Sequence, residues 1–155
     1  MIGIKSFLKE MLNNQELIIC FRLLIAAFLS LLIGFQRRKV KGDISILRTH
    51  ILICVGAAFI SGLGELLAIN STSIDITRLS AQIISGIGFL GAGVIIKDGF
   101  SISGLTTSST IWFVGCLGIG VGFGYYIMSI FATFIILIFL FLLRDDKYEE
   151  YNNDF

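Results

Sequence analysis

The sequence contains no proline, one histidine and three cysteines among its 155 residues. Without proline, a long helix lacks the residue that most often kinks or ends one. The cysteines, Cys20, Cys54 and Cys116, are far apart in apolar stretches, and no CxxC pair occurs. One histidine and isolated cysteines cannot build a zinc site, so we expect buried free thiols and no metal centre.

Charged residues are also scarce, at 15% of the chain, against about 25% in soluble domains. Hydrophobic residues make up 55%, and the mean hydropathy is +0.91. This balance argues against an ordinary soluble domain and predicts that lipid surrounds most of the chain. The length suits one domain.

Recognised catalytic motifs are absent: the sequence has no HExxH, no P-loop and no evident nucleophile–base pair. The stretch "SGIGFLGAG" does read GxGxxG at 86–91. It lies inside the apolar run 79–96, however, and the next acid, Asp98, comes too early for the ribose contact of a dinucleotide fold. We therefore predict a protein that is not an enzyme and that binds neither a cofactor nor nucleic acid.

Five apolar segments approach the roughly 20 residues that a membrane-spanning helix needs. The last two almost touch, so the stretch "GIGVGFGYY" must hold a tight turn. The predicted fold class is an all-α membrane protein, a bundle of about five transmembrane helices within residues 15–143. The expected spans are 17–35, 50–67, 79–96, 105–123 and 125–143.

Two short segments flank this bundle. Residues 1–14 place apolar side chains at helical spacing among lysines and a glutamate, which predicts an amphipathic helix on the bilayer surface. Residues 144–155 form a short charged tail. The tail is too small to be a domain.

Basic residues are distributed unevenly, and their distribution predicts the orientation. In a five-span topology, eight of the twelve Lys and Arg fall on one side, which the positive-inside rule makes cytoplasmic. The N-terminus is then outside and the C-terminus cytoplasmic. The eight are Arg37, Arg38, Lys39, Lys41, Arg48, Lys97, Arg144 and Lys147.

Glycines gather in the third and fourth spans. Helices in lipid associate by close packing, which small residues permit. We interpret these glycines as helix contact surfaces, and a pore or a broken helix is the alternative. The packing candidates are Gly86, Gly88, Gly91, Gly93, Gly118 and Gly122.

Polar side chains within the spans are the functional candidates, because placing them in lipid is costly. Arg78, Gln82 and Ser85 share one face of the third span. Asp75 precedes Arg78 by three residues and can pair with it or cap the helix. Gln82 lies about one turn deep and needs a partner.

A run of hydroxyls begins the fourth span in "GLTTSSTIW", which contains Thr106 and Thr107. These side chains can cap the helix, join helices, or bind a phosphate or another anion. The motif "LRTH" brings Arg48, Thr49 and His50 to the inner end of the second span. His50 is the side chain expected to titrate near neutral pH, either as a hydrogen-bonded structural group or as a sensor.

Arg22 lies about five residues inside the first span, or roughly 8 Å from its outer end. Its long side chain could extend back to the headgroups. Glu65 lies at a comparable depth on the second span, so we hypothesise that the two form an ion pair. Glu16, Glu65 and Asp75 all fall on the outer side, which leaves a cation site open, since Mg²⁺ prefers carboxylate oxygens.

Three motifs occur in order within about residues 20–126: "LRTH", "RLSAQIISGIGFLGAG" and "GLTTSSTIW". Together with "GFQRR" they resemble the MgtC/SapB family of bacterial inner-membrane proteins. The family's polar and glycine positions match here at Arg22, Gly34, Arg37, Arg48, Thr49, His50, Asp75, Arg78, Gln82, Gly86, Gly88, Gly91, Gly93, Gly104, Thr106, Thr107 and Trp112.

The resemblance implies a five-helix membrane domain associated with growth at low magnesium, acid stress and intracellular survival of pathogens. The family's best-known member is regarded as a regulator that restrains the F-type ATP synthase. This chain departs from the family pattern at Gln36, usually Glu, and at Ile46, usually Gly. It resembles the short members, which lack a soluble C-terminal domain.

We therefore expect a multi-pass protein of the bacterial inner membrane, a non-catalytic regulator that acts through another membrane protein in magnesium or acid stress. The alternative is a small transporter of Mg²⁺ or another ion. Lipid and a membrane protein are the expected partners, with Mg²⁺ and self-association left open. The candidate partner- or ion-binding residues are Arg22, Arg37, Arg48, Thr49, His50, Asp75, Arg78, Gln82, Thr106 and Thr107.

Overall fold

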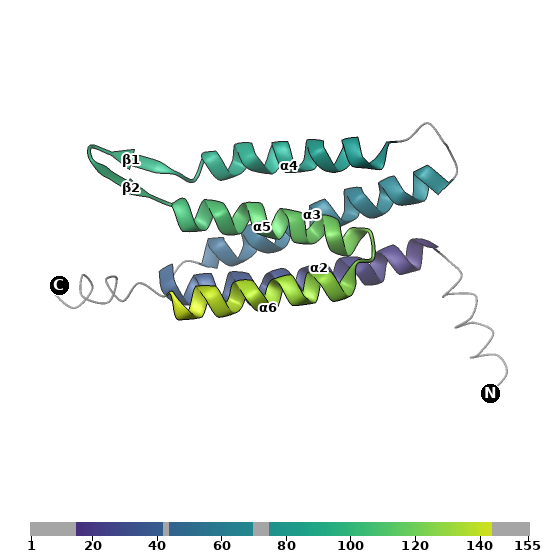
Figure 1. The fold of residues 1–155 in the computed structure, drawn as a ribbon, viewed down its shortest axis with the longest axis horizontal. Helices are drawn as coiled ribbons and strands as arrows, with labels where there is room; N and C mark the ends of the chain where they lie inside the picture. Colours follow the sequence, from purple (N-terminus) through teal and green to yellow (C-terminus); the bar gives the residue numbers. More distant parts are fainter. Residues whose placement is uncertain (1–14, 42–43, 70–74, 144–155) are drawn as a thin grey trace.

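The computed structural model describes residues 15–41, 44–69 and 75–143. The predicted surface helix 1–14 and tail 144–155 lie outside the described residues. Within these described ranges the fold consists of five helices and one short hairpin (Figure 1). They are α2 (Gln15–Lys41), α3 (Ile44–Ile69), α4 (Ile76–Ala92), β1 (Ile96–Asp98), β2 (Ser101–Ser103), α5 (Leu105–Gly122) and α6 (Tyr126–Leu142).

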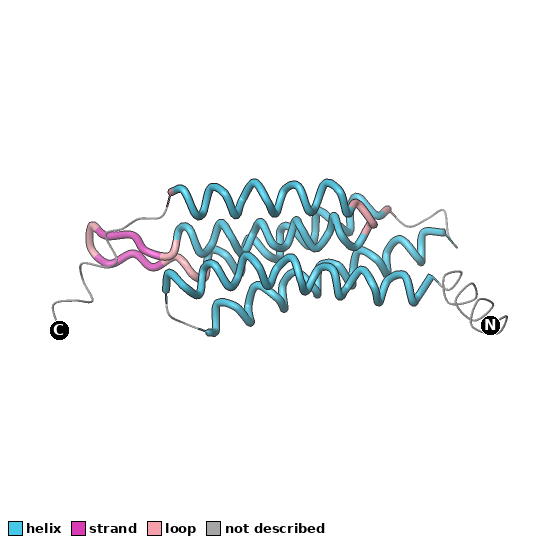
Figure 2. The backbone as a smooth tube through the Cα atoms, turned by 90° about the horizontal axis from the view of Figure 1, so that it is seen from below, coloured by secondary structure: helices cyan, strands magenta, loops and turns pink. Residues whose placement is uncertain are grey.

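The five helices run side by side along one long axis (Figure 2). Over the described residues, α2, α3 and α5 are long and apolar enough to cross a membrane, while α4 and α6 are apolar helices of 17 residues. Seventeen residues reach about 26 Å, at the short end of transmembrane lengths. The predicted all-α membrane fold is confirmed, and the orientation of the chain stays a prediction.

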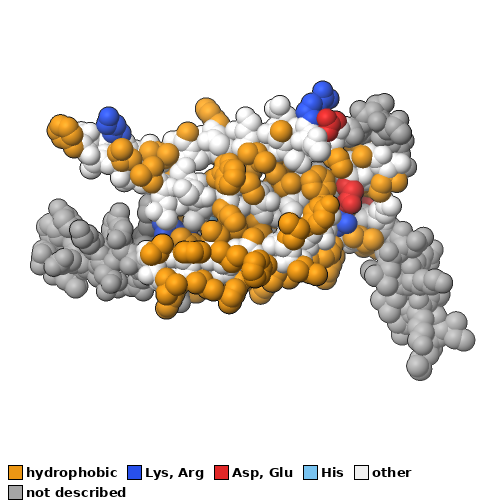
Figure 3. All heavy atoms as spheres, in the orientation of Figure 1, with side chains coloured by type: hydrophobic (Ala, Val, Ile, Leu, Met, Phe, Trp, Pro, Cys, Tyr) orange, Lys and Arg blue, Asp and Glu red, His pale blue; other side chains and the backbone are white. Residues whose placement is uncertain are grey.

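Hydrophobic side chains cover much of the molecular surface. Figure 3 shows them along α6 and over the centre of the bundle, with charged side chains near the two ends. Exposed side chains include Phe131, Phe134 and Phe141 on α6. This distribution matches a bilayer that surrounds the middle of the bundle and leaves its ends in water.

The hairpin β1–β2 was not predicted from the sequence. The third span was expected to continue to residue 96, but α4 ends at Ala92 and the chain turns into an antiparallel pair that extends from one end of the bundle (Figure 2). Gly104 then leads into α5 with φ +86, and a Cβ there would overlap the Val94 carbonyl oxygen. Only glycine suits this tight connection.

The core lies between α2, α3 and α5. Its fully buried side chains include Ile33, Cys54, Ala58, Val114 and Val121. In Figure 1, α4 and α6 lie along opposite edges of the bundle, where α4 packs on α5 and α3 and α6 packs on α5 and α2. The two edge helices therefore keep large lipid-facing surfaces.

Close helix contacts occur at three of the predicted packing glycines. A Cβ on Gly118 would overlap the Cys54 carbonyl oxygen, and one on Gly122 would come within 2.7 Å of the Ala58 carbonyl oxygen. On α4, a Cβ on Gly91 would lie 2.9 Å from the Ser108 hydroxyl oxygen. These glycines bring α5 close to α3 and α4, as expected for helices packed in lipid.

The packing interpretation does not hold for Gly86 and Gly88. A Cβ on either residue would meet nothing within 4 Å, because this face of α4 turns away from the rest of the described chain. A Cβ on Gly93 would approach only the carbonyl oxygens of Leu90 and Phe89 in the preceding turn. The glycine-rich stretch thus leaves an open surface on α4.

Candidate functional site

Arg22 on α2 is the centre of a polar cluster at one end of the bundle. Its Nη1 forms an ion pair with the Glu65 carboxylate of α3 and donates a hydrogen bond to the Gly122 carbonyl of α5. Its Nε donates to the Tyr126 hydroxyl of α6 at 3.2 Å. The predicted pair of Arg22 with Glu65 is confirmed. We call this end of the bundle the clamp end.

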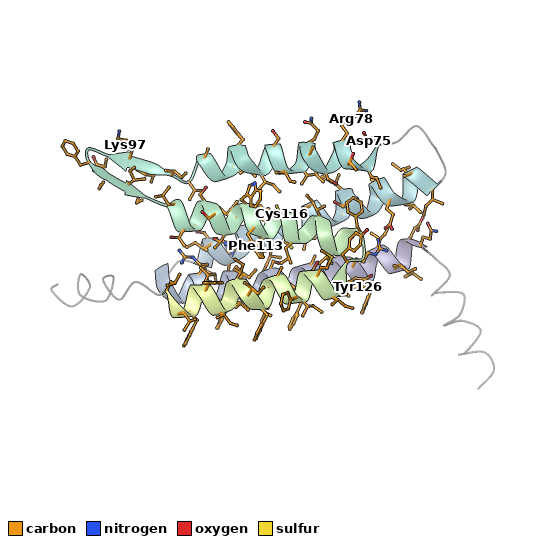
Figure 4. The ribbon with its side chains drawn as sticks, in the orientation of Figure 1. Asp75, Arg78, Lys97, Phe113, Cys116 and Tyr126 are labelled. Atoms are coloured by element: carbon orange, nitrogen blue, oxygen red, sulfur yellow. The ribbon has the colours of Figure 1, made fainter. Side chains whose placement is uncertain are left out.

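We call the contacts of Arg22 with Glu65, Gly122 and Tyr126 the clamp. The clamp joins α2, α3, α5 and α6 through one guanidinium group. The Arg22 side chain is 13% exposed and that of Glu65 is 36% exposed, so the pair is partly shielded from solvent. Gly124, with φ +79, packs against the same group, where a Cβ would lie 3.0 Å from Nη2. Figure 4 places Tyr126 at this end of α6. The arrangement is that of a structural anchor.

The carboxylates of Glu16, Glu65 and Asp75 do not assemble a metal site. Within the described residues, no group of three His, Cys, Asp or Glu side chains could hold a metal ion. Glu65 lies instead beside a small cavity of about 110 Å³ between α2 and α3, and its carboxylate is engaged by Arg22. The cation site that the sequence left open is not formed by these side chains.

Asp75 caps the N-terminus of α4. Its Oδ1 accepts hydrogen bonds from the Thr77 hydroxyl at 2.6 Å and from the backbone N–H groups of Thr77 and Arg78 at 2.9 and 3.1 Å. The expected contact with Arg78 is therefore made by its backbone. The hydrogen bonds of Thr77 and then of Arg78 hold the pKa of the Asp75 carboxyl below its ordinary value.

Acid is expected to weaken this cap. The pKa of Asp75 is lower in the folded protein than its unfolded value of about 3.9. The ionised cap therefore contributes its full stabilisation above the unfolded pKa, and this stabilisation is lost as the pH falls through the pKa of the folded protein. The melting temperature in detergent, measured from neutral to acidic pH, should fall less steeply for Asp75→Asn, which caps without titrating. Asp98→Asn, in the exposed hairpin, is the control. An unchanged slope for Asp75→Asn would contradict this.

The outward face of α4 combines a polar side chain with small ones. Gln82 and Ser85 are exposed there, beside Gly86 and Gly88, and Phe89 is 81% exposed. Neither the Gln82 amide nor the Ser85 hydroxyl has a hydrogen-bond partner among the described residues. We call these five residues the α4 face.

His50 on α3 is fully buried and uses both ring nitrogens. Nδ1 lies 2.7 Å from the Ile46 carbonyl oxygen, which can only accept, so Nδ1 carries a hydrogen. Nε2 lies 3.0 Å from the Thr110 hydroxyl of α5. Thr110, 60 residues away in the sequence, was not predicted as its partner. His50 thus has the geometry of a hydrogen-bonded structural group that joins α3 to α5.

A larger cavity of about 400 Å³ lies beside His50 at the opposite end of α3 from the clamp. We call this the basic end, since Arg37, Arg48 and Lys97 lie there; Figure 4 shows Lys97 at this end and Asp75, Arg78 and Tyr126 at the other. The residues that line the cavity are Ser45, Ile46, Thr49, His50, Val94, Thr107 and Ile111.

Most of the predicted site residues therefore separate into three places. Thr49, His50 and Thr107 meet at the cavity, and Arg37 is buried nearby, where its charge acts on His50. Arg48 and Thr106 are exposed and do not line the cavity. Arg22 belongs to the clamp, and α4 carries Asp75, Arg78 and Gln82.

The fold and these sites define a multi-pass α-helical membrane protein. The chain belongs to the MgtC family, whose profile matches residues 23–147. It is 42% identical over 113 residues to protein MgtC of Brucella abortus (strain 2308), covering 73% of this chain and 46% of that protein. It is 41% identical over 124 residues to protein MgtC of Salmonella typhimurium (strain 14028s), covering 79% and 51%.

A third relative is YhiD of Escherichia coli (strain K12), whose name describes it as a candidate magnesium transporter. The identity is 35% over 124 residues, which is 77% of this chain and 57% of YhiD. The chain thus spans about half the length of the curated relatives it matches. No solved structure matches it significantly.

Proposed function

We propose that this protein is a non-catalytic regulator that binds another membrane protein through the α4 face. The observation that carries the proposal is the exposed Gln82, which has no hydrogen-bond partner among the described residues. An amide left unpaired in hydrocarbon is costly, and polar side chains in lipid hydrogen-bond across helices. A partner helix that packs on α4 would satisfy it.

The small residues of the same face support this docking mode. Gly86 and Gly88 have open space where a Cβ would stand, so a second backbone can approach α4 closely. Phe89, the bulky member of the face, offers an apolar anchor next to them. A transmembrane helix with small residues and one hydrogen-bonding side chain is the partner that fits.

The link to magnesium or acid stress rests on the family. The YhiD relative carries a magnesium-related name, and the family resemblance implies a role at low magnesium. This chain offers no carboxylate cluster for Mg²⁺ within its described residues. A regulatory role in magnesium or acid stress, exerted through a bound membrane protein, accommodates both facts.

Transport of Mg²⁺ or another ion is the alternative function. It would require Arg78, Gln82 and the Thr/Ser run to line one path. Arg78 and Gln82 instead lie exposed on α4, while Thr107 lines a cavity at the basic end. The two polar cavities adjoin opposite ends of α3. These positions favour the regulator.

Gln82→Leu tests the proposal. Because Gln82 has no hydrogen-bond partner among the described residues, the substitution should leave the melting temperature unchanged. It should reduce crosslinking to the partner about tenfold, the equivalent of one hydrogen bond of about 1.4 kcal/mol. The measurement uses a photo-crosslinking residue in place of Phe89, the bulky and 81% exposed member of the α4 face, in cells grown at low magnesium.

The matched control places the same crosslinker at Ile127, which is 86% exposed on the opposite edge helix α6. It should not capture the band obtained from Phe89. Equal capture at both positions, or no effect of Gln82→Leu, would refute the α4 face. Saturable Mg²⁺ uptake by the purified protein in liposomes, abolished by Gln82→Ala, would favour the transporter.

A further inference from the structure

The cavity at the basic end is lined by hydroxyl groups without a carboxylate. Ser45, Thr49 and Thr107 contribute hydroxyls from α3 and α5, and the remaining lining residues are His50, Ile46, Val94 and Ile111. A cation would find no ionised oxygen among these side chains. The lining suits a ligand that accepts hydrogen bonds.

The N-termini of two helices point to this end of the bundle. α3 begins at Ile44 and α5 at Leu105, and helix N-termini carry partial positive charge and free N–H groups. The cap of α5 is Gly104, which makes no side-chain hydrogen bond. The first hydrogen bond of the helix runs from the Ser108 N–H to the Gly104 carbonyl at 2.8 Å. The three preceding N–H groups therefore have no capping side chain.

Thr107 supplies a second, independent observation. This residue lies in the first turn of α5, lines the cavity and is only 5% exposed. Its hydroxyl oxygen is buried and has no hydrogen-bond partner in the described structure. Leaving a buried hydroxyl unpaired is unfavourable, so a ligand oxygen at this position would remove that cost.

The charge of the surroundings favours an anion. Arg37 of α2 is 7% exposed and acts electrostatically on His50, which forms part of the cavity wall. Both nitrogens of His50 are engaged, by Ile46 and Thr110. The hydroxyl of Thr49 already donates to the Ser45 carbonyl at 2.9 Å, so it has no hydrogen left for a ligand. The donors that remain for a ligand are the hydroxyl and the backbone N–H of Thr107, which alone among the three residues with uncapped N–H groups lines the cavity.

The geometry points to a binding site for a phosphate-type oxyanion in this cavity. Backbone N–H groups at a helix N-terminus together with a threonine hydroxyl form a recurrent phosphate-binding arrangement. A free phosphate and the headgroup of a phospholipid share this chemistry. The site is separate from the α4 face, so it stands independently of the proposed function.

Thr107→Val tests the site in the purified full chain. In detergent, inorganic phosphate should raise the melting temperature saturably relative to chloride at equal ionic strength. Valine keeps the shape and removes the hydroxyl, so the apparent phosphate affinity should fall about tenfold. Thr106→Val is the matched control: the neighbouring residue is exposed and outside the cavity, and the phosphate response should persist.

A second arm separates the two sources of phosphate. In nanodiscs without free phosphate, phosphatidylglycerol should stabilise the wild type more than Thr107→Val if a headgroup occupies the cavity. A response to phosphatidylglycerol alone assigns a lipid, and a response to inorganic phosphate alone assigns a soluble anion. The proposal is overturned if neither probe stabilises the wild type, or if Thr107→Val responds as the wild type does.

Stability without ligand gives an independent reading. Because the Thr107 hydroxyl has no partner in the described structure, its removal should leave the melting temperature unchanged or raise it. A clear loss of stability in phosphate-free detergent would mean that the hydroxyl bonds within the protein, and that outcome also overturns the site.

Discussion

Replacing Arg22 by leucine is expected to lower the free energy of unfolding by about 3 kcal/mol, the lower end of the cost of breaking a buried ion pair. The lower end applies because the Glu65 side chain is 36% exposed. The substitution also removes the donors to the Gly122 carbonyl and the Tyr126 hydroxyl. All four helices that meet at the clamp are affected. Reversible denaturation in detergent measures the loss.

The double mutant decides whether the pair itself is responsible. Glu65→Leu alone leaves the guanidinium of Arg22 without its counter-charge, so it should also destabilise the protein. Arg22→Leu with Glu65→Leu removes both charges and should recover much of the loss. Tyr126→Phe, which removes one hydrogen bond, is the control and should cost about 1 kcal/mol. Losses that simply add in the double mutant would mean that the two residues act separately.

This pair could be predicted because membrane depth is readable from the sequence. The depth of a residue in the membrane follows from its distance along the helix from the end of the span. Arg22 and Glu65 are predicted to lie at a similar depth. Tyr126 was missed because an aromatic residue next to a turn is already explained by the headgroup region. Its hydroxyl meets Arg22 only through the packing of α6 on α2.

Helix positions were also predictable, since the bilayer requires long apolar segments. The hairpin β1–β2 gave no such signal, because strands of three residues that are all on the surface have no hydrophobic pattern. For a related reason, the sequence did not show which face of α4 points away from the bundle. In lipid both faces of a helix are apolar, so hydropathy does not distinguish an inward glycine from an outward one.

The sequence also could not show which threonine of the hydroxyl run enters the cavity at the basic end. The hydroxyl run indicated an anion site as one alternative, but Thr106 and Thr107 were equal candidates. Successive residues on a helix differ by about 100° in direction. The fold buries Thr107 and exposes Thr106. The pairing of His50 with Thr110 required the contact of α3 with α5, across 60 residues of sequence.

The second large effect is expected at Gly118. A side chain there would overlap the Cys54 carbonyl oxygen and approach the Ala57 Cβ to 2.9 Å. Both atoms belong to α3, whose backbone and fully buried Cys54 cannot move aside without separating the core helices. Gly118→Leu should therefore cost about 3 kcal/mol or more, the upper range for overpacking. Thermal unfolding in detergent and the amount of protein in the membrane measure this.

Gly88→Leu is the matched control, because the same side chain there meets open space. It should leave the melting temperature close to that of the wild type while obstructing a partner that packs on α4. The pair of substitutions thus separates packing within the chain from binding to a partner. If Gly88→Leu unfolds the protein and Gly118→Leu does not, the inward and outward faces of α4 and α5 have been assigned incorrectly, and the proposed docking surface fails with them.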